Sequence, residues 1–198
     1  MLRRIVVSTL GHVDHGKSSL LDNIRGTTIV EREAGKITQA IGASIIPIET
    51  IKRVCGNLLN SIKGGITIPG ILAIDTPGHE AFTTLRKRGG NLADIAIVVV
   101  DVKEGFKPQT EEAVKILKES KTPFVIAANK IDLIPGWKEV KGNLIEKLNK
   151  QNPNVIGEIE NKIYGIVGKL SQFEFNSERF DRVEDYTCLL YTSPSPRD

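Results

Sequence analysis

The chain has 198 residues, a formal net charge of +3 and 40% hydrophobic residues, which allows one α/β domain with its core but little more. The mildly positive charge permits an RNA-rich partner without requiring one, because a solvated surface gives the same balance. Cys55 and Cys188 lie far apart without a C-x-x-C pattern, which argues against a disulfide framework or a zinc site and suits a reducing cytosol. No stretch approaches the length needed to span a membrane.

Apolar runs alternate with amphipathic stretches, a pattern typical of a parallel sheet with helices on both faces. The runs predict five strands, at residues 5–10, 43–48, 71–74, 95–100 and 123–128. Helices are predicted between them, over residues 18–24, 49–63, about 80–90, and from Pro108 through Leu117. Each polar motif described below therefore follows the end of a strand, where open α/β sheets bind ligands.

Beyond Trp137 the periodicity becomes helical and predicts two further helices that pack on the sheet domain. The first is expected to carry one apolar face, made of Val140, Leu144, Ile145 and Leu148. After the break at residues 152–154, the second carries a longer apolar face at 4-4-3-4 spacing, made of Val155, Ile159, Ile163, Ile166 and Leu170.

The first strand leads into a string that fits the phosphate-loop pattern G-x-x-x-x-G-K-[ST]. Backbone N–H groups and the lysine of such a loop cradle the phosphates of a nucleotide. We expect Lys17 to reach the β- and γ-phosphate oxygens and the Ser18 hydroxyl to bind Mg²⁺. The residues predicted to bind nucleotide in this loop are Gly11, His12, Val13, Asp14, His15, Gly16, Lys17, Ser18 and Ser19.

Two further motifs follow later strands. Asp75-Thr76-Pro77-Gly78 ends the third strand; Asp75 is suited to hold a magnesium-bound water, and Gly78 leaves its N–H free for the γ-phosphate. The same four residues also read as an ordinary turn, so their role depends on their place between the other motifs. Asn129, Lys130 and Asp132 follow the fifth strand. The Asp132 carboxylate can accept two N–H bonds from guanine that adenine cannot donate in the same arrangement.

Two single residues complete the predicted site. His79 directly follows the Asp-x-x-Gly string, where an imidazole is placed to orient the attacking water, and we predict it as the catalytic residue. Thr38 lies in the irregular stretch after the first helix, where a second magnesium ligand is needed. Spacing alone leaves Thr38 open between that role and an ordinary loop threonine.

At these residues the chain resembles the translational GTPases, and one branch closely, the initiation factor two/five-B family. The likeness rests on Gly-His-Val-Asp-His-Gly-Lys at residues 11–17 and on the strings at residues 33–43, 75–82 and 86–90. Residues 105–110, 135–137 and the insertion at 49–63 resemble the archaeal and eukaryotic form of the family. The resemblance covers about residues 4–187.

The resemblance implies a three-layer P-loop GTPase domain with a mostly parallel sheet, truncated before its last strand and helix. It implies GTP and GDP as substrate and product, Mg²⁺ held by Ser18, Thr38 and Asp75, and a monovalent cation near Asp14. His79 takes the place of the family's water-positioning histidine. The parent protein would act in the cytoplasm, promote joining of ribosomal subunits and hydrolyse GTP against large-subunit rRNA. Initiator tRNA would bind through domains absent here, with no DNA or membrane partner.

The expected domain covers residues 1–187, and residues 188–198 match the translation of a common transposon-type sequencing adapter. We expect these eleven residues to be a non-native tail rather than a Ser/Pro linker. The same residues bear on three alternatives. A tRNA-delivering elongation factor shares residues 11–17 but typically has Asp-Cys-Pro-Gly-His where this chain has Asp-Thr-Pro-Gly-His. A phosphate-loop ATPase is contradicted by Asn129 and Asp132, and a truncated fragment could lack function.

Overall fold

A five-stranded sheet forms the centre of the fold. The computed structural model describes residues 3–25, 42–56, 59, 67–75, 93–142, 144–180 and 182. The strands are β1 (Ile5–Leu10), β2 (Gly42–Pro47), β3 (Gly70–Asp75), β4 (Ile95–Asp101) and β5 (Phe124–Asn129). The helices are α1 (Lys17–Arg25), α2 (Ile48–Cys55), α4 (Pro108–Ser120), the 3₁₀ turn η3 (Ile131–Leu133), α5 (Leu144–Asn149) and α6 (Pro153–Gln172).

The strand order is β2-β3-β1-β4-β5. β1 pairs in parallel with β3 and β4, β4 pairs in parallel with β5, and β2 runs antiparallel to β3. The central strands are nearly continuous apolar runs, as expected where helices cover both faces of a parallel sheet. The predicted mostly parallel sheet is therefore confirmed.

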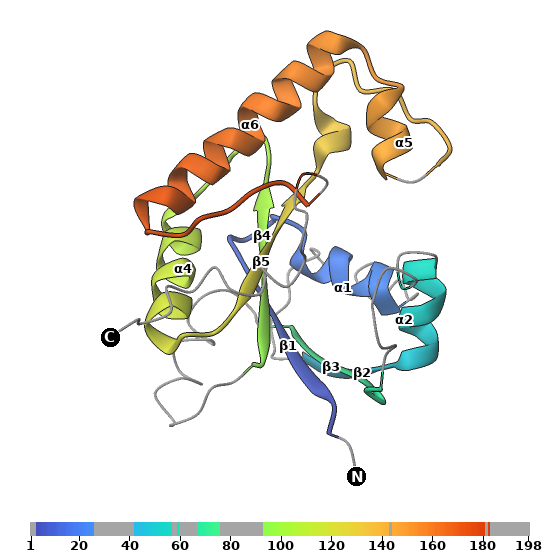
Figure 1. Cartoon of the computed structure of the whole chain (residues 1–198), viewed down its shortest axis with the longest axis vertical. Coiled ribbons are helices and arrows are strands. Elements are labelled where there is room, and N and C mark those ends of the chain that lie inside the picture. Colours follow the sequence, from blue (N-terminus) through green and yellow to red (C-terminus); the bar gives the residue numbers. More distant parts are fainter. Residues whose placement is uncertain are drawn as a thin grey trace.

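Helices cover both faces of the sheet and give three layers (Figure 1). On one face α1 and α2 pack over β3 and β2 around a core that includes Leu21, Ile46 and Ala73. On the other face α4 and α6 cover β4 and β5 around a larger core that includes Val98 and Val114, both fully buried. Alternate residues of β4, namely Ala96, Val98 and Val100, face the larger core, because successive side chains of a strand point to opposite faces of the sheet.

The long helix α6 begins at Pro153, inside the predicted break at residues 152–154, and packs through the predicted face. Asn152 caps it by accepting a hydrogen bond from the Asn154 N–H at 2.9 Å, and Pro153 occupies its first turn. The predicted apolar face is buried or packed against the core, through Val155, Ile159, Ile163, Ile166 and Leu170. No helix in the described part of the chain is both long and apolar enough to cross a membrane.

The helix predicted around Val140 is shorter than expected. Gly142 has φ +135°, far from helical values, so the helix begins only at Leu144 and excludes Val140. Leu144 and Ile145 are 43% and 45% exposed, and only Leu148 of the predicted face packs against the core formed with α6. The prediction of one continuous apolar face here is wrong.

Other boundaries differ by a few residues. Ile48 begins α2 instead of ending β2, and α2 ends at Cys55 because Gly56 turns the chain with φ +50°. The strands β3, β4 and β5 each extend to a polar residue, namely Asp75, Asp101 and Asn129. The helix predicted over 80–90, most of the predicted extension of α2, and the tail at 188–198 lie outside the described residues.

Candidate nucleotide-binding site

The candidate site lies at the carboxyl edge of the sheet, where four neighbouring parallel strands end. The pairing register sets Asp75 of β3 beside Thr9 of β1, and Asp101 of β4 beside Asn129 of β5. The loop of residues 11–16 leaves β1 at the same edge and enters α1. This is the position at which open α/β sheets bind ligands, and three sequence motifs meet there.

The loop passes close to its neighbours at two glycines. Gly11 has φ +138°, and a Cβ built on it would lie 2.3 Å from the carbonyl oxygen of Val99 in β4. Gly16 has φ +90°, and its Cβ would lie 2.3 Å from the side-chain nitrogen of Asn129. The first and last glycines of the pattern are therefore required by close approach and backbone conformation together.

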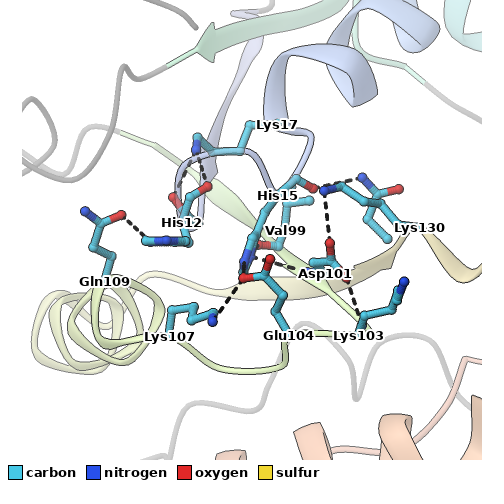
Figure 2. Close-up of polar contacts among 12 residues, drawn as sticks. His12, His15, Lys17, Val99, Asp101, Lys103, Glu104, Lys107, Gln109 and Lys130 are labelled. Atoms are coloured by element: carbon cyan, nitrogen blue, oxygen red, sulfur yellow. Dashed lines mark hydrogen bonds and ion pairs between the residues drawn. The ribbon is translucent and has the colours of Figure 1, made fainter. Parts of the chain in front are cut away.

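Lys17 opens α1 and turns its side chain back over the loop (Figure 2). Its Nζ donates to the carbonyl oxygens of Gly11, at 3.0 Å, and His12, at 2.7 Å. Burial lowers the pKa of Lys17, whereas the carboxylates of Asp75 and Asp14 oppose that change. A cation held against backbone carbonyls above a loop of N–H groups is suited to bind an anionic phosphate.

Ser18 and Asp75 bring oxygen donors together beside the lysine. The Ser18 hydroxyl donates to Asp75 Oδ2 at 2.8 Å, and the Thr9 hydroxyl donates to Asp75 Oδ1 at 3.3 Å. Asp75 is 5% exposed, so its carboxylate is held in a defined position. A hydroxyl and a carboxylate are the hard oxygen ligands that Mg²⁺ prefers, and this donor set fits that ion.

The Asn-Lys-x-Asp motif at residues 129–132, which is predicted to read the base, contacts the phosphate loop directly. Asn129 Nδ2 donates to the carbonyl oxygen of His15 at 2.9 Å. Lys130 follows in a left-handed conformation, with φ +62°, and Asp132 lies exposed in η3. The Asn129 side chain thus fixes the spacing between the two loops, and the left-handed residue turns the chain so that Asp132 follows within one short helical turn.

The His15 ring is buried, 1% exposed, and lies under the loop between β4 and the segment that follows it (Figure 2). Its Nδ1 lies 3.3 Å from both the Val99 carbonyl oxygen and the Asp101 N–H nitrogen, so the tautomer decides which bond forms. Its Nε2 lies 3.7 Å from a carboxylate oxygen of Glu104. Burial lowers the pKa of His15, although the hydrogen bond with Val99 opposes that change.

His12 and Lys107 extend this network onto α4. His12 Nδ1 lies 2.7 Å from Gln109 Oε1, and the His12 ring meets the His15 ring edge-on at 5.2 Å. Lys107 pairs with Glu104 at 3.0 Å. The two loop histidines were predicted only as members of the phosphate loop. His12 joins this loop to α4, and His15 joins it to the segment between β4 and α4.

The remaining predicted residues fall into two groups. Val13 and Asp14 are exposed at the turn of the loop, and Ser19 is exposed in the first turn of α1. Thr38, Thr76, Pro77, Gly78 and His79 lie outside the described residues.

The sequence reasoning missed Asp101. This residue is 4% exposed and pairs through Oδ2 with Lys130 Nζ at 2.9 Å. The available signal was its position: like Asp75 and Asn129, it is the polar residue that ends an apolar strand. Glu104 and Gln109 carried no comparable signal, because their contacts with the loop join residues far apart in the sequence.

The sheet is mostly parallel, and its first strand runs through a glycine loop into a helix. An Asp ends β3 and an Asn-Lys-x-Asp follows β5, on either side of β1 and β4 at the same edge of the sheet. This arrangement is the P-loop GTPase fold. The profile of the elongation factor Tu GTP binding domain matches residues 2–189. The chain therefore belongs to this family of GTP-binding domains.

Within this family, the chain is similar to curated proteins named as translation initiation factors. A protein of Methanopyrus kandleri named "Probable translation initiation factor IF-2" is 57% identical over 195 residues, which are 98% of this chain and 33% of the relative. A protein of the same name from Methanococcus maripaludis is 58% identical over 196 residues, again 98% and 33%. The chain thus spans about a third of the length of the curated relatives it matches.

Solved structures agree. GDP-bound aIF5B from Aeropyrum pernix is 52% identical with a TM-score of 0.78, over 94% of this chain and 31% of that one. The bacterial selenocysteine-specific elongation factor EF-Sec is 25% identical with a TM-score of 0.56, over 89% of this chain and 25% of that one. The predicted resemblance to the initiation factor two/five-B family is confirmed, and the elongation-factor alternative is less well supported.

Proposed function

We propose that this chain is the guanine-nucleotide-binding and GTP-hydrolysing domain of a translation initiation factor that promotes joining of ribosomal subunits. The observation that carries the proposal is a pair of contacts on the phosphate loop. Ser18 ties the loop to Asp75 on one side, and Asn129 ties it to the base-reading motif on the other. Phosphate, metal and base recognition are thereby held at one edge of the sheet.

Each residue has a role in this proposal. The loop N–H groups and Lys17 bind the phosphates, which costs little rearrangement because Lys17 already lies over the loop. Ser18 and Asp75 would hold Mg²⁺, joined by Thr38, and the ion when bound would neutralise charge on the phosphates. Asn129 positions the base loop and Asp132 accepts the guanine N–H groups. A monovalent cation beside the exposed Asp14 also belongs to the proposal.

His79 is proposed to orient the attacking water, because it directly follows Gly78 in the motif that begins at Asp75. Hydrolysis is proposed to be stimulated by the large ribosomal subunit and its rRNA. Initiator tRNA would contact other parts of the whole protein. The names of the curated relatives support a ribosomal partner, and the net charge of +3 is compatible with an RNA-rich one. The whole protein is proposed to act in the cytoplasm.

Base selectivity tests the proposal most directly. Binding of guanosine, xanthosine and adenosine diphosphates to the purified chain is compared by competition, with Asp132→Asn beside the parent. The parent should prefer guanosine diphosphate. The variant should bind it roughly 10- to 100-fold more weakly, because a mismatched buried hydrogen bond costs about 1–3 kcal/mol, and should shift toward xanthosine diphosphate.

Glu158→Gln is the matched control, since it removes one negative charge from an exposed position of α6. It should leave the preference unchanged. A parent that prefers adenosine diphosphate, or that binds none of the three nucleotides, would overturn the proposed function. A variant that keeps full guanosine preference would remove Asp132 from base reading.

A further inference from the structure

We propose that Asp101 is a positioning residue for guanine recognition and that it acts through Lys130. This inference rests on the proposed function and adds to it a residue outside the three motifs. Asp101 ends β4, next to Asn129 in the sheet register, and therefore lies beside the base-reading loop without belonging to it.

Both oxygens of the Asp101 carboxylate contact neighbouring groups (Figure 2). Oδ2 pairs with Lys130 Nζ at 2.9 Å, and Oδ1 accepts the Lys103 N–H at 2.8 Å. Its side chain is 6% exposed, whereas that of Lys130 is 28% exposed. Burial alone would raise the pKa of Asp101, but the hydrogen bonds from Lys130 and Lys103 outweigh burial and lower it. The carboxylate is therefore ionised and held in place.

The backbone of Asp101 reaches the other loops of the site. Its N–H points at His15 Nδ1 at 3.3 Å, and its carbonyl oxygen accepts the Gly105 N–H at 2.8 Å. The next residue, Val102, donates to the Asn129 carbonyl oxygen at 3.1 Å. The backbone of Asp101 and Val102 thus connects the phosphate loop, the segment before α4 and the base-reading loop.

The contact with Lys130 has a specific consequence. Lys130 adopts a left-handed conformation that costs a non-glycine residue free energy, so it persists only when its surroundings hold it. Its neighbours are Asn129, which ties down the phosphate loop, and η3, which carries Asp132. By holding the Lys130 side chain, Asp101 fixes the turn that sets the two base-reading residues relative to each other.

The test measures release of GDP from the 198-residue chain and its preference for GDP over ADP. Asp101→Asn keeps the size of the side chain but removes its charge. We expect GDP release to be about tenfold faster and the preference for GDP over ADP to be smaller. A tenfold change lies within the usual range of coupling between sites. Asp101→Glu, which keeps the charge, should restore part of the slow release.

Asp94→Asn is the matched control. Asp94 lies at the opposite end of the same strand and makes the same kinds of contact, an ion pair with Arg3 and a bond from the Val6 N–H at 2.8 Å. Asp94→Asn should lower the free energy of unfolding but keep GDP release and base preference at the parental level. A purely structural role for Asp101 would make the two variants behave alike.

A second comparison tests whether Asp101 acts on GDP binding through Lys130. Lys130→Met should speed release, and the double variant with Asp101→Asn should release GDP no faster than Lys130→Met alone. Without nucleotide, acylation of the Lys130 amine, followed by mass spectrometry, should be faster in Asp101→Asn than in the parent or Asp94→Asn.

Three results would each overturn the inference. Asp101→Asn could keep the parental GDP release and base preference, the two substitutions could have additive effects in the double variant, or Lys130 acylation could be unchanged in Asp101→Asn. A parent without guanine preference is a different result and overturns the proposed function. Unchanged acylation in that case separately overturns the contact between Asp101 and Lys130.

Discussion

Replacement of Gly11 with alanine should destabilise the chain and weaken nucleotide binding together. The new Cβ would lie 2.3 Å from the Val99 carbonyl oxygen, a separation that real Cβ atoms essentially never show. The Val99 backbone cannot shift without a cost in free energy, because β4 is paired with both β1 and β5 around Val99. The backbone at φ +138° also disfavours any side chain.

The two effects give the expected magnitude. Backbone strain in a conformation reserved for glycine costs about 1–3 kcal/mol, and forced overpacking costs about 1–3 kcal/mol. Together they predict a loss of about 2–6 kcal/mol in the free energy of unfolding, out of the roughly 5–15 kcal/mol typical of a folded domain. Relief of the clash would move the phosphate loop away from β4 and would displace the N–H groups that are proposed to bind the phosphates.

Urea denaturation followed by circular dichroism measures the loss, and GDP titration measures the binding. Gly157→Ala is the matched control, because nothing lies within 4 Å of its Cβ position and it lies inside α6. Alanine there should stabilise the chain by about 0.5–1 kcal/mol through helix propensity. A free energy of unfolding for Gly11→Ala within about 0.5 kcal/mol of the parent would refute the steric reasoning.

Two further predictions concern stability. Burial lowers the pKa of folded His15 below the ordinary value of 6.5. The contribution of His15 to the free energy of unfolding is therefore complete above pH 6.5 and is lost as the pH falls through the folded pKa. Between about pH 7.5 and 5.5, His15→Gln should therefore lose less free energy of unfolding than the parent, and equal losses would contradict this. Leu170→Ala should cost about 2–5 kcal/mol in urea denaturation, because Leu170 is 2% exposed in the core between α6 and α4. Ile145→Ala, at a side chain 45% exposed, should change stability by less than about 0.5 kcal/mol, and equal costs for the two would show that α6 is not docked.

The motifs and most elements could be predicted because their causes are local. Each strand of the sheet is a short apolar run, and the face of α6 follows from the 4-4-3-4 spacing of its apolar residues. Two element boundaries were mispredicted at glycines with positive φ, and one of them is Gly56, with φ +50°, at the end of α2. Gly142, with φ +135°, delays α5 until Leu144, and a hydrophobic pattern contains no information about that angle.

Local sequence is enough to predict that a phosphate loop, an Asp and an Asn-Lys-x-Asp each follow a strand, since a strand end and a polar motif each extend over only a few residues. Which strand ends lie side by side is a property of the tertiary structure, because strand order depends on burying both faces of the sheet at once. That order places Asp101 beside Asn129 and turns the His15 ring under the loop toward Val99. The contact between Asp101 and Lys130 arises from this long-range pairing, so no local sequence pattern predicts it.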